Sequence, residues 1–554
     1  MKRILSVTVI CALLLTCCAS MSSCGTLPPS KLFDADSEES PSENTTGVNF
    51  ANENRYENSG FQMGSGTQDD PFIICTVEDL ENLRELINGD RHDIFCTASF
   101  SLGNDIDLQN KEWTPIGVFV DRDFRGTFDG HGYSILNFKI TTFQSNADVT
   151  GLFGTSTGVI KNLTVSGFNI DLRSDNYVTV GGIVGNSYGA NSSISNCHVT
   201  NGKVRVISKS PANIGGICGT AQETDITKCS SSATVHGEST LKSGENASQI
   251  PDTRGGSIVG SIFNGSISHC TSDGDISMSS ANYCLQAGGI VGAAISSDIS
   301  SSDSSCRIKI NSSYSSGDYQ YTCGYAGGIC GEINGGTISR SFHSGNISVK
   351  GSSNYYVGGL AGWLNGDIVN SYATSKISLN AAGLHGNLNI IGAFIGGLAG
   401  FAESGRISAC YSSGSIEAWF KYSPLFTGGL IGIGYSDVVL SDCLSATNIA
   451  TAITAYESAP SIPITLFVGY FSGEYCYDVT LDNCYRSTSA SLEGQFASLF
   501  LPANECYIEP YASSGLSSCE TSRWNAPAFY QNTLGWDTKV WNLRNNSLPT
   551  LYRT

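Results

Sequence analysis

A short glycine-rich motif, which we call the glycine phrase, recurs along this chain between residues 151 and 473. It consists of a glycine doublet, aliphatic residues and a closing glycine, as in GGIVG at Gly181–Gly185 and GGLAG at Gly358–Gly362. Further copies stand at Gly215–Gly219, Gly256–Gly260, Gly288–Gly292, Gly327–Gly331, Gly396–Gly400 and Gly428–Gly432, with degenerate first and last copies at Gly151–Gly154 and Val468–Tyr470. Repetition at this interval predicts a solenoid, in which each unit buries its apolar face only against its neighbours.

The segments between the phrases predict strands. Helical periodicity is absent from them, and 63 glycines among 554 residues suit short strands joined by tight turns. An aliphatic residue follows each phrase along the chain, and a mostly small residue stands three positions after it. Aligned across the repeats, these small residues form a column: Leu163, Cys197, Cys229, Cys270, Ser302, Ser341, Ser371, Cys410, Cys443 and Cys484. We therefore expect an all-β fold, a parallel β-helix solenoid, and we expect it to be right-handed.

The spacing of the phrases alternates between short and long. From Gly182 onward, their second glycines follow one another at 34, 40, 33, 39, 31, 38, 32 and 40 residues. The extra residues precede every second phrase, as in Val235–Arg254 and Asn311–Tyr325. We expect longer loops on one flank at every second unit. Such insertions often mark the binding face of a solenoid, and silent variation in tolerant surface turns is the alternative.

The first sixty residues have the composition of an export signal and a tether. Two basic residues and an apolar stretch lead to Met21-Ser22-Ser23-Cys24, which resembles a bacterial lipobox. Residues 1–24 are therefore predicted to be a signal peptide with lipidation at Cys24, and a freely secreted protein is the alternative. Residues 25–60 are rich in Ser, Glu, Asn and Pro, which predicts a disordered tether.

Caps are expected at both ends of the repeats. Residues 61–150 should form an N-terminal cap with a short helix that begins after Thr76 and places apolar residues at helical spacing (Leu80, Leu83, Leu86, Ile87). The repeats then occupy residues 151–486, and residues 487–554 are predicted to be a C-terminal cap.

The repeats resemble the GLUG repeat family. The best match to that pattern is GGLAGWLNGDIVNSYATSKI at Gly358–Ile377, and the likeness extends from about Gly151 to Tyr485. The resemblance implies a parallel β-helix on a bacterial surface or secreted protein, with an adhesive or structural role. Some family members also carry a zinc peptidase that cleaves immunoglobulin A1. None of the seven histidines here begins an H-E-x-x-H motif, so we expect that peptidase to be absent.

Sixteen cysteines follow the signal region, and disulfides are the usual expectation for an exported protein. Residues stacked in a parallel ladder lie about 4.8 Å apart, beyond the roughly 3.8 Å between the Cβ atoms of a disulfide. The cysteines of the column are therefore expected to be buried thiols. Pairing is more plausible outside regular strands, and three pairs are candidates: Cys506 with Cys519, Cys75 with Cys96, and Cys284 with Cys323.

Two further groups of residues are candidates for a site. An aromatic row, Phe342, Tyr372, Tyr411 and Tyr485, follows the small-residue column by one position and should point outward, where it could stack on sugar rings. Local packing of the rings is the alternative. The acidic residues Asp105, Asp107, Asp121, Asp123 and Asp129 could in principle ligate calcium or act in acid–base catalysis, but Asp-x-Asp is common in turns.

Composition narrows the function classes. A net charge of −19 argues against a nucleic-acid partner. The strands are expected to be nearly charge-free, which argues against an enzyme. No C-x-x-C motif occurs, so we expect neither a metal site nor a cofactor. We expect a non-catalytic, monomeric bacterial protein, held at the cell surface or outer membrane by its lipid or else secreted, with adhesin-like binding of host glycans, proteins or matrix polysaccharide. The alternatives are a passive structural spacer or coat protein and a polysaccharide-active β-helix enzyme.

Overall fold

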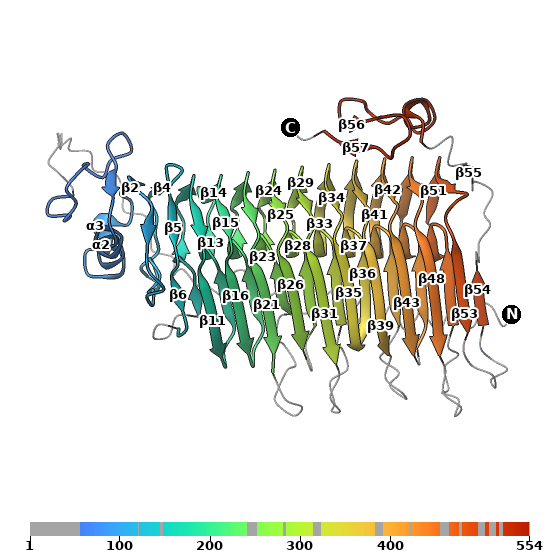
Figure 1. The fold of residues 1–554 in the computed structure, drawn as a ribbon, viewed down its shortest axis with the longest axis horizontal. Coiled ribbons are helices and arrows are strands. Elements are labelled where there is room, and N and C mark those ends of the chain that lie inside the picture. The colour runs from blue at the N-terminus through green and yellow to red at the C-terminus, as the bar shows by residue number, and fades with distance from the viewer. Residues whose placement is uncertain are drawn as a thin grey trace, which may run out of the picture.

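The computed structural model describes residues 56–552, apart from 120, 144–147, 241–251, 281–283, 314–322, 383–391, 422, 455–464, 476–478, 497–504, 509–516 and 520–524. The chain winds into a parallel β-helix whose strands stack in sequence order (Figure 1). The all-β solenoid predicted from the repeats is confirmed, while the hand of its winding stays a prediction.

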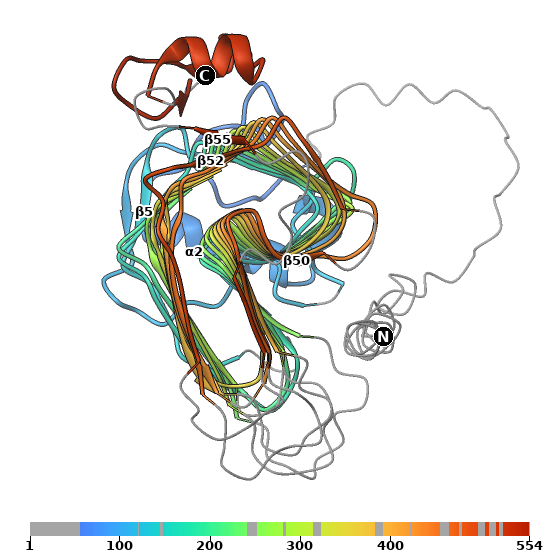
Figure 2. The same ribbon diagram turned by 90° about the vertical axis from the view of Figure 1, so that its right-hand side faces the viewer.

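Each coil passes through four sheets, which we call A, B, C and D. A representative coil runs through β13 (Val184–Tyr188) and β14 (Ser193–Ser195) in sheet A and then β15 (His198–Thr200) in sheet B. It continues through β16 (Lys203–Ser208) in sheet C and β17 (Ala212–Gly215) in sheet D. Viewed along the axis, sheet D runs into the middle of the cross-section, and the chain then hooks back out through sheet A (Figure 2).

Sheets C and D contain eleven strands each. In sheet C the others are β6 (Lys139–Ile140), β11 (Asn169–Ser174), β21 (Thr234–Ser239), β26 (Asp275–Ser280), β31 (Arg307–Ser313), β35 (Asn346–Ser352), β39 (Lys376–Ala382), β43 (Ser415–Lys421), β48 (Asn448–Thr454) and β53 (Leu492–Phe496). In sheet D they are β7 (Val149–Thr150), β12 (Val178–Gly181), β22 (Thr253–Gly256), β27 (Leu285–Gly288), β32 (Cys323–Gly327), β36 (Asn354–Gly358), β40 (Ala393–Gly396), β44 (Leu425–Gly428), β49 (Thr465–Gly469) and β54 (Glu505–Ile508).

The glycine phrase forms the tight corner between sheets D and A. A Cβ atom on Gly359 would lie 2.1 Å from the carbonyl oxygen of Gly397 in the next coil, closer than any real side chain permits. The aliphatic residues of the phrase are fully buried inside the coil, as Ile183 and Ile217 are. The phrase therefore combines a backbone contact that excludes side chains with an apolar group for the core.

The Cys/Ser column forms the corner between sheets A and B. The residue before each of these side chains has a positive φ, such as 51° at Asn196 and 48° at Arg340. The column side chain donates a hydrogen bond to the carbonyl two residues earlier, from Cys197 Sγ to Ser195 O and from Ser341 Oγ to Ser339 O. Where cysteine or serine stands in the column, the corner therefore holds a small side chain that is also a donor, whereas the first corner is filled by the buried apolar side chain of Leu163.

The N-terminal end begins as predicted. Helix α2 (Val77–Asn88) starts at Thr76 with a capping box, in which Thr76 Oγ1 accepts from the Asp79 amide and the Asp79 carboxylate accepts from the Thr76 amide. Its residues Leu80, Leu83, Leu86 and Ile87 are buried in the same core as the first strands. A short helix, α3 (His92–Phe95), follows, and β1 (Phe72–Ile74) pairs in parallel with β2 (Ser99–Leu102).

The C-terminal segment lies beside the coils rather than across their end. Parallel pairing continues past residue 486 through β52 (Tyr485–Ser487), β53, β54 and β55 (Ser517–Cys519). The segment of residues 525–552, which contains the helical turn η2 (Phe529–Thr533) and the hairpin of β56 (Trp541–Asn542) and β57 (Thr550–Leu551), then folds back along the outside of sheet B (Figures 1 and 2). We call it the C-terminal strap.

The length alternation belongs to one edge of the β-helix. The longer connections leave the ends of the sheet C strands β21, β31, β39 and β48 and enter the sheet D strands β22, β32, β40 and β49. The bounding strands therefore place all four connections on one flank, as expected. Most of the inserted residues (241–251, 314–322, 383–391 and 455–464) lie outside the described part of the chain.

Candidate binding surfaces

The predicted aromatic row is covered by the C-terminal strap. The row stands at the start of the sheet B strands β34 (Phe342–His343), β38 (Tyr372–Ala373), β42 (Tyr411–Ser412) and β52, with Leu444 of β47 (Leu444–Ser445) between the last two. Its rings stack face to face, with centroids 4.8 Å apart from Phe342 to Tyr372 and again from Tyr372 to Tyr411.

The strap seals the middle of this row. Trp541 lies 6.1 Å from both Tyr372 and Tyr411, measured between ring centroids, and Tyr411 donates a 2.7 Å hydrogen bond to the Pro549 carbonyl. Only 7% of Tyr372 and 1% of Tyr411 is exposed. The outward direction inferred from strand alternation is right, but the rings bind the chain's own strap, so the interpretation as a sugar-stacking row is wrong for Tyr372 and Tyr411.

A second aromatic ladder fills the re-entrant corner where the outer faces of sheets D and A meet. Tyr325, Tyr356, Phe394, Phe426 and Phe467 occupy one register row of sheet D, with successive centroids 4.9 to 5.2 Å apart. Trp363 and Phe401 of sheet A stack at 4.4 Å and pack against the same rings. None of these rings is more than 7% exposed, so the ladder holds the hook closed and offers no open surface. The spacing of the glycine phrases does not predict this ladder, because it does not show that sheets D and A lie face to face.

In the earlier coils the same corner is polar. The register row of Tyr325 continues to Gln286 and Arg254. Arg254 Nε donates a 2.6 Å hydrogen bond to Gln286 Oε1, and Gln286 Nε2 donates to the carboxylates of both Asp252 and Glu332. We call these four residues the corner network. Its side chains satisfy one another, and Arg254 and Gln286 are almost fully buried.

The carboxylates of the corner network are held toward their neutral forms. Burial, together with the nearby charge of Asp252, raises the pKa of Glu332 to about 7, and Arg254 opposes this shift. Burial also raises the pKa of Asp252, again against the effect of Arg254. Raised carboxylate pKa values occur at catalytic sites and in buried structural networks alike. The closure of this corner favours the structural interpretation.

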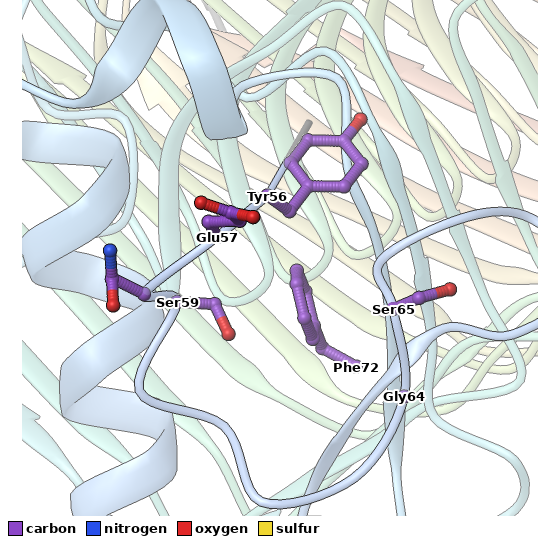
Figure 3. A pocket seen from close by; sticks show the side chains of 7 residues that line it. Tyr56, Glu57, Ser59, Gly64, Ser65 and Phe72 are labelled. Carbon is purple, nitrogen blue, oxygen red and sulfur yellow. The ribbon is translucent and has the colours of Figure 1, made fainter. Parts of the chain in front are cut away.

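Two pockets lie at the N-terminal end. One, of about 270 Å³, is lined by Tyr56, Glu57, Ser59, Gly64 and Phe72 among others, and its labelled side chains come from the segments beside α2 (Figure 3). The other, of about 490 Å³, is lined by residues that include Asp129, His131, Tyr133 and Lys161. Neither brings together a recognisable catalytic set.

The predicted acidic residues form hydrogen bonds and ion pairs with nearby residues. Burial opposes the effect, but hydrogen bonds from the Asn162 side chain and the His131 amide hold the pKa of Asp129 below its usual range, and Lys161 lies 3.4 Å away. Asp123 likewise pairs with Arg125 at 2.8 Å. Within the described residues, no three His, Cys, Asp or Glu side chains are grouped to hold a metal ion.

Sheet C presents an open face with an unexpected charge. Its strands carry nine of the chain's 30 Lys and Arg residues but only five of its 49 Asp and Glu residues. The cations are Lys139, Arg173, Lys203, Arg205, Arg307, Lys309, Lys350, Lys376 and Lys421, and the anions are Asp171, Glu238, Asp275, Glu417 and Glu493. These side chains alternate along the strands with buried Ile, Val, Leu, Ala and Phe residues, so they point outward. The expectation of nearly charge-free strands is therefore wrong for this sheet.

One large aromatic residue is exposed on the same face. Trp419 of β43 is 48% exposed, and its register neighbours are Asn380 on β39 and Ala452 on β48. Among the described residues, the other large apolar side chains that are this open lie in the N-terminal cap or near the C-terminus. Nothing in the spacing of the glycine phrases singles this residue out.

The cysteines follow two patterns. Cys197, Cys229, Cys270, Cys410, Cys443 and Cys484 are buried free thiols, as expected for the column. Cys284 and Cys323 form a disulfide between adjacent coils, with their Cα atoms 4.5 Å apart. Cys75 and Cys96 are not joined in a disulfide, so the expected bridge in the N-terminal cap is wrong. Cys506 lies in sheet D and Cys519 in sheet B, and their side chains are outside the described part.

The anchoring prediction falls outside the described residues. Cys24 precedes residue 56, where the described part begins, so lipidation stays a prediction. Within that part, the helices are too short or too polar to cross a bilayer.

Similarity to known proteins agrees with the repeat interpretation. The GLUG motif matches residues 176–205 and 353–378. A "Putative Gly-rich membrane protein" of Evansella cellulosilytica is 32% identical over 147 residues, which is 25% of this chain and 16% of that protein. Halomucin of Haloquadratum walsbyi is 29% identical over 175 residues, 31% of this chain and 2% of its own length. The chain thus spans only a small part of these relatives.

A solved structure, "Crystal structure of a putative immunoglobulin A1 protease" from Bacteroides ovatus, aligns with 89% of this chain and 96% of its own. The identity is 16% and the TM-score 0.29. The resemblance to GLUG-repeat proteins drawn from the sequence is confirmed by the motif matches: this chain is a parallel β-helix that carries GLUG motifs within its repeats.

Proposed function

We propose that this protein is a non-catalytic, surface-associated bacterial β-helix protein that binds an extracellular polysaccharide or glycoprotein along its side. The observation that carries this proposal is the outer face of sheet C, where eleven strands in sequence order present a polar surface that no described segment of the chain covers. At about 4.8 Å per strand, this face is about 50 Å long. A long, flat and rigid face suits an extended ligand better than a small molecule, for which an enclosed pocket is usual.

The other faces support the choice of sheet C. The C-terminal strap covers the outer face of sheet B from β34 to β52, and side chains of the chain itself fill the corner between sheets D and A. The similarity of parts of the chain to a Gly-rich membrane protein and to halomucin supports a surface-associated role. The lipid anchor at Cys24 would place the β-helix outside the membrane.

A binding assay tests the proposal directly. The purified protein would be applied to immobilised neutral and acidic polysaccharides and to mucin-type glycoproteins, and soluble sugars released from each would be measured in parallel. We expect saturable binding without release of products. Release of oligosaccharides would favour the enzymatic alternative, and the corner network would then be the first candidate catalytic site to test. Absence of binding to every ligand would favour the passive spacer.

A further inference from the structure

We propose that Trp419 and the lysines around it form a binding site for an anionic polysaccharide that lies along sheet C. The inference rests on the proposed function and narrows it in two ways. It assigns a negative charge to the ligand, and it assigns the site to the coils of β31, β35, β39, β43 and β48.

The charge distribution is the first step. The whole chain has a net charge of −19, whereas the strands of sheet C contain nine cationic and five anionic side chains. Three of those anions already have close partners: Asp171 lies 3.0 Å from Arg205, Asp275 lies 2.7 Å from Arg307, and Glu417 lies 2.8 Å from Lys376. The remaining cations outnumber the remaining anions, so this face attracts anions on a protein that otherwise repels them.

The surroundings of Trp419 are the second step. Glu417 and Lys421 flank it on its own strand, and Lys350 lies two strands away in the same register row. On the other side, Ala450 and Ala452 rise only one carbon above the sheet, which leaves the indole uncovered beside a strand without bulky outward groups. A flat aromatic ring bordered by hydrogen-bonding groups is the usual partner for the apolar face of a sugar ring.

The density of charge selects the class of ligand. Nucleic acids carry one phosphate per nucleotide and are bound by dense basic patches. Here carboxylates are interspersed among the cations, and the surplus is spread over eleven strands. A polymer with about one charge per sugar or fewer fits such a surface. An anionic membrane would require clustered basic residues beside several apolar side chains, whereas Trp419 is one exposed ring on a flat sheet.

A matched pair of polymers tests the sign of the charge. Binding of the full chain to polygalacturonate would be compared with binding to its methyl ester, which has the same backbone without charge, and hyaluronan and chondroitin sulfate would extend the set. We expect at least one acidic polymer to bind, and to bind at least about tenfold more tightly than the methyl ester. This binding should weaken as the NaCl concentration rises from about 50 to 500 mM.

Variants test the location. Trp419→Ala should weaken this binding about 10- to 30-fold, as for a buried aromatic contact, and Trp419→Phe should restore most of it. The triple variant Lys309→Gln, Lys350→Gln, Lys421→Gln should weaken binding by about tenfold at low salt and flatten its salt dependence. The control triple Lys161→Gln, Lys228→Gln, Lys539→Gln removes the same charge away from sheet C and should bind like the wild type. Circular dichroism would verify that each variant is folded.

The possible failures are distinguishable. Equal binding to polygalacturonate and its ester, or binding to neutral glycans alone, would overturn this inference and leave the proposed function standing. Equal weakening by the two lysine triples, or unchanged binding by Trp419→Ala, would overturn the assigned site. Tighter binding to anionic vesicles or duplex DNA than to any acidic polysaccharide would overturn the ligand class. Binding to no polysaccharide or glycoprotein at all would overturn the proposed function as well.

Discussion

Glu332→Gln should make this protein more stable at alkaline pH and leave its stability unchanged in acid. In the wild type, burial raises the pKa of Glu332 to about 7, against 4.5 for an ordinary glutamate. Below pH 4.5 the side chain is neutral in both the folded and the unfolded chain, so it costs nothing. Between pH 4.5 and 7 the unfolded chain loses this proton first, and the folded protein therefore loses stability as the pH rises.

The size of the effect follows from the shift. One pKa unit corresponds to about 1.4 kcal/mol, so a shift from 4.5 to about 7 gives an upper limit of about 3.5 kcal/mol above pH 7. Part of the Glu332 side chain is exposed, so we expect about 1 to 3 kcal/mol. Glutamine keeps an oxygen that can accept from Gln286 Nε2, so the variant should retain this hydrogen bond while removing the charge.

Thermal melts at several pH values would measure this. At about 1 °C per kcal/mol for a chain of this size, Glu332→Gln should melt about 1 to 3 °C above the wild type at pH 8 and at the same temperature as the wild type at pH 4.5. Glu417→Gln is the control, because Glu417 pairs with Lys376 on the open face and should give no such pH-dependent gain. Parallel melting curves of Glu332→Gln and the wild type across this range would refute the reasoning.

Three further perturbations probe the fold. Tyr411→Phe leaves the buried Pro549 carbonyl without its donor, so the strap should lose about 1 kcal/mol, and amide exchange should rise in peptides from residues 529–542 but not in sheet C; unchanged exchange in the strap would contradict this. Ser341→Ala removes the donor at one corner and should lower the melting temperature more than Ser341→Cys, because the chain uses cysteine at equivalent corners; a reversed order would count against the donor role. Cys284→Ser should cost about 2 to 4 kcal/mol, and reducing agent should destabilise the wild type but not this variant; Cys197→Ser, at a free thiol, should keep the wild-type sensitivity to reductant.

Much of the coil could be predicted from the sequence because its information is local and periodic. The capping box at Thr76 and the apolar spacing behind it predict α2 within a few residues. The glycine doublet and the Cys/Ser column repeat because each coil meets the same contacts, such as the approach of Gly359 to the next coil. The sequence predicts that the column requires small side chains. The structure adds the reason for cysteine and serine, because both can donate a hydrogen bond to the carbonyl two residues earlier.

The candidate sites were less accessible to sequence reasoning. Strand alternation correctly predicts that Tyr372 and Tyr411 point outward, but it cannot reveal that a segment about 140 residues later in the chain covers them. The cations of sheet C did leave a signal, since Arg205 and Lys309 each stand between two aliphatic residues of a short strand. Their shared face becomes evident only when the register aligns the coils.

The sequence by itself therefore determined the repeating unit: a parallel β-helix, its corners and its buried columns, because neighbouring coils impose the same steric and hydrogen-bonding demands at each turn. Only the tertiary structure decided which outward faces stay open. The strap covers the later strands of sheet B and the aromatic ladder fills the later part of the corner between sheets D and A, while sheet C exposes its cations and Trp419. Those outcomes depend on contacts between segments far apart in the chain, and the period of a repeat contains no information about them.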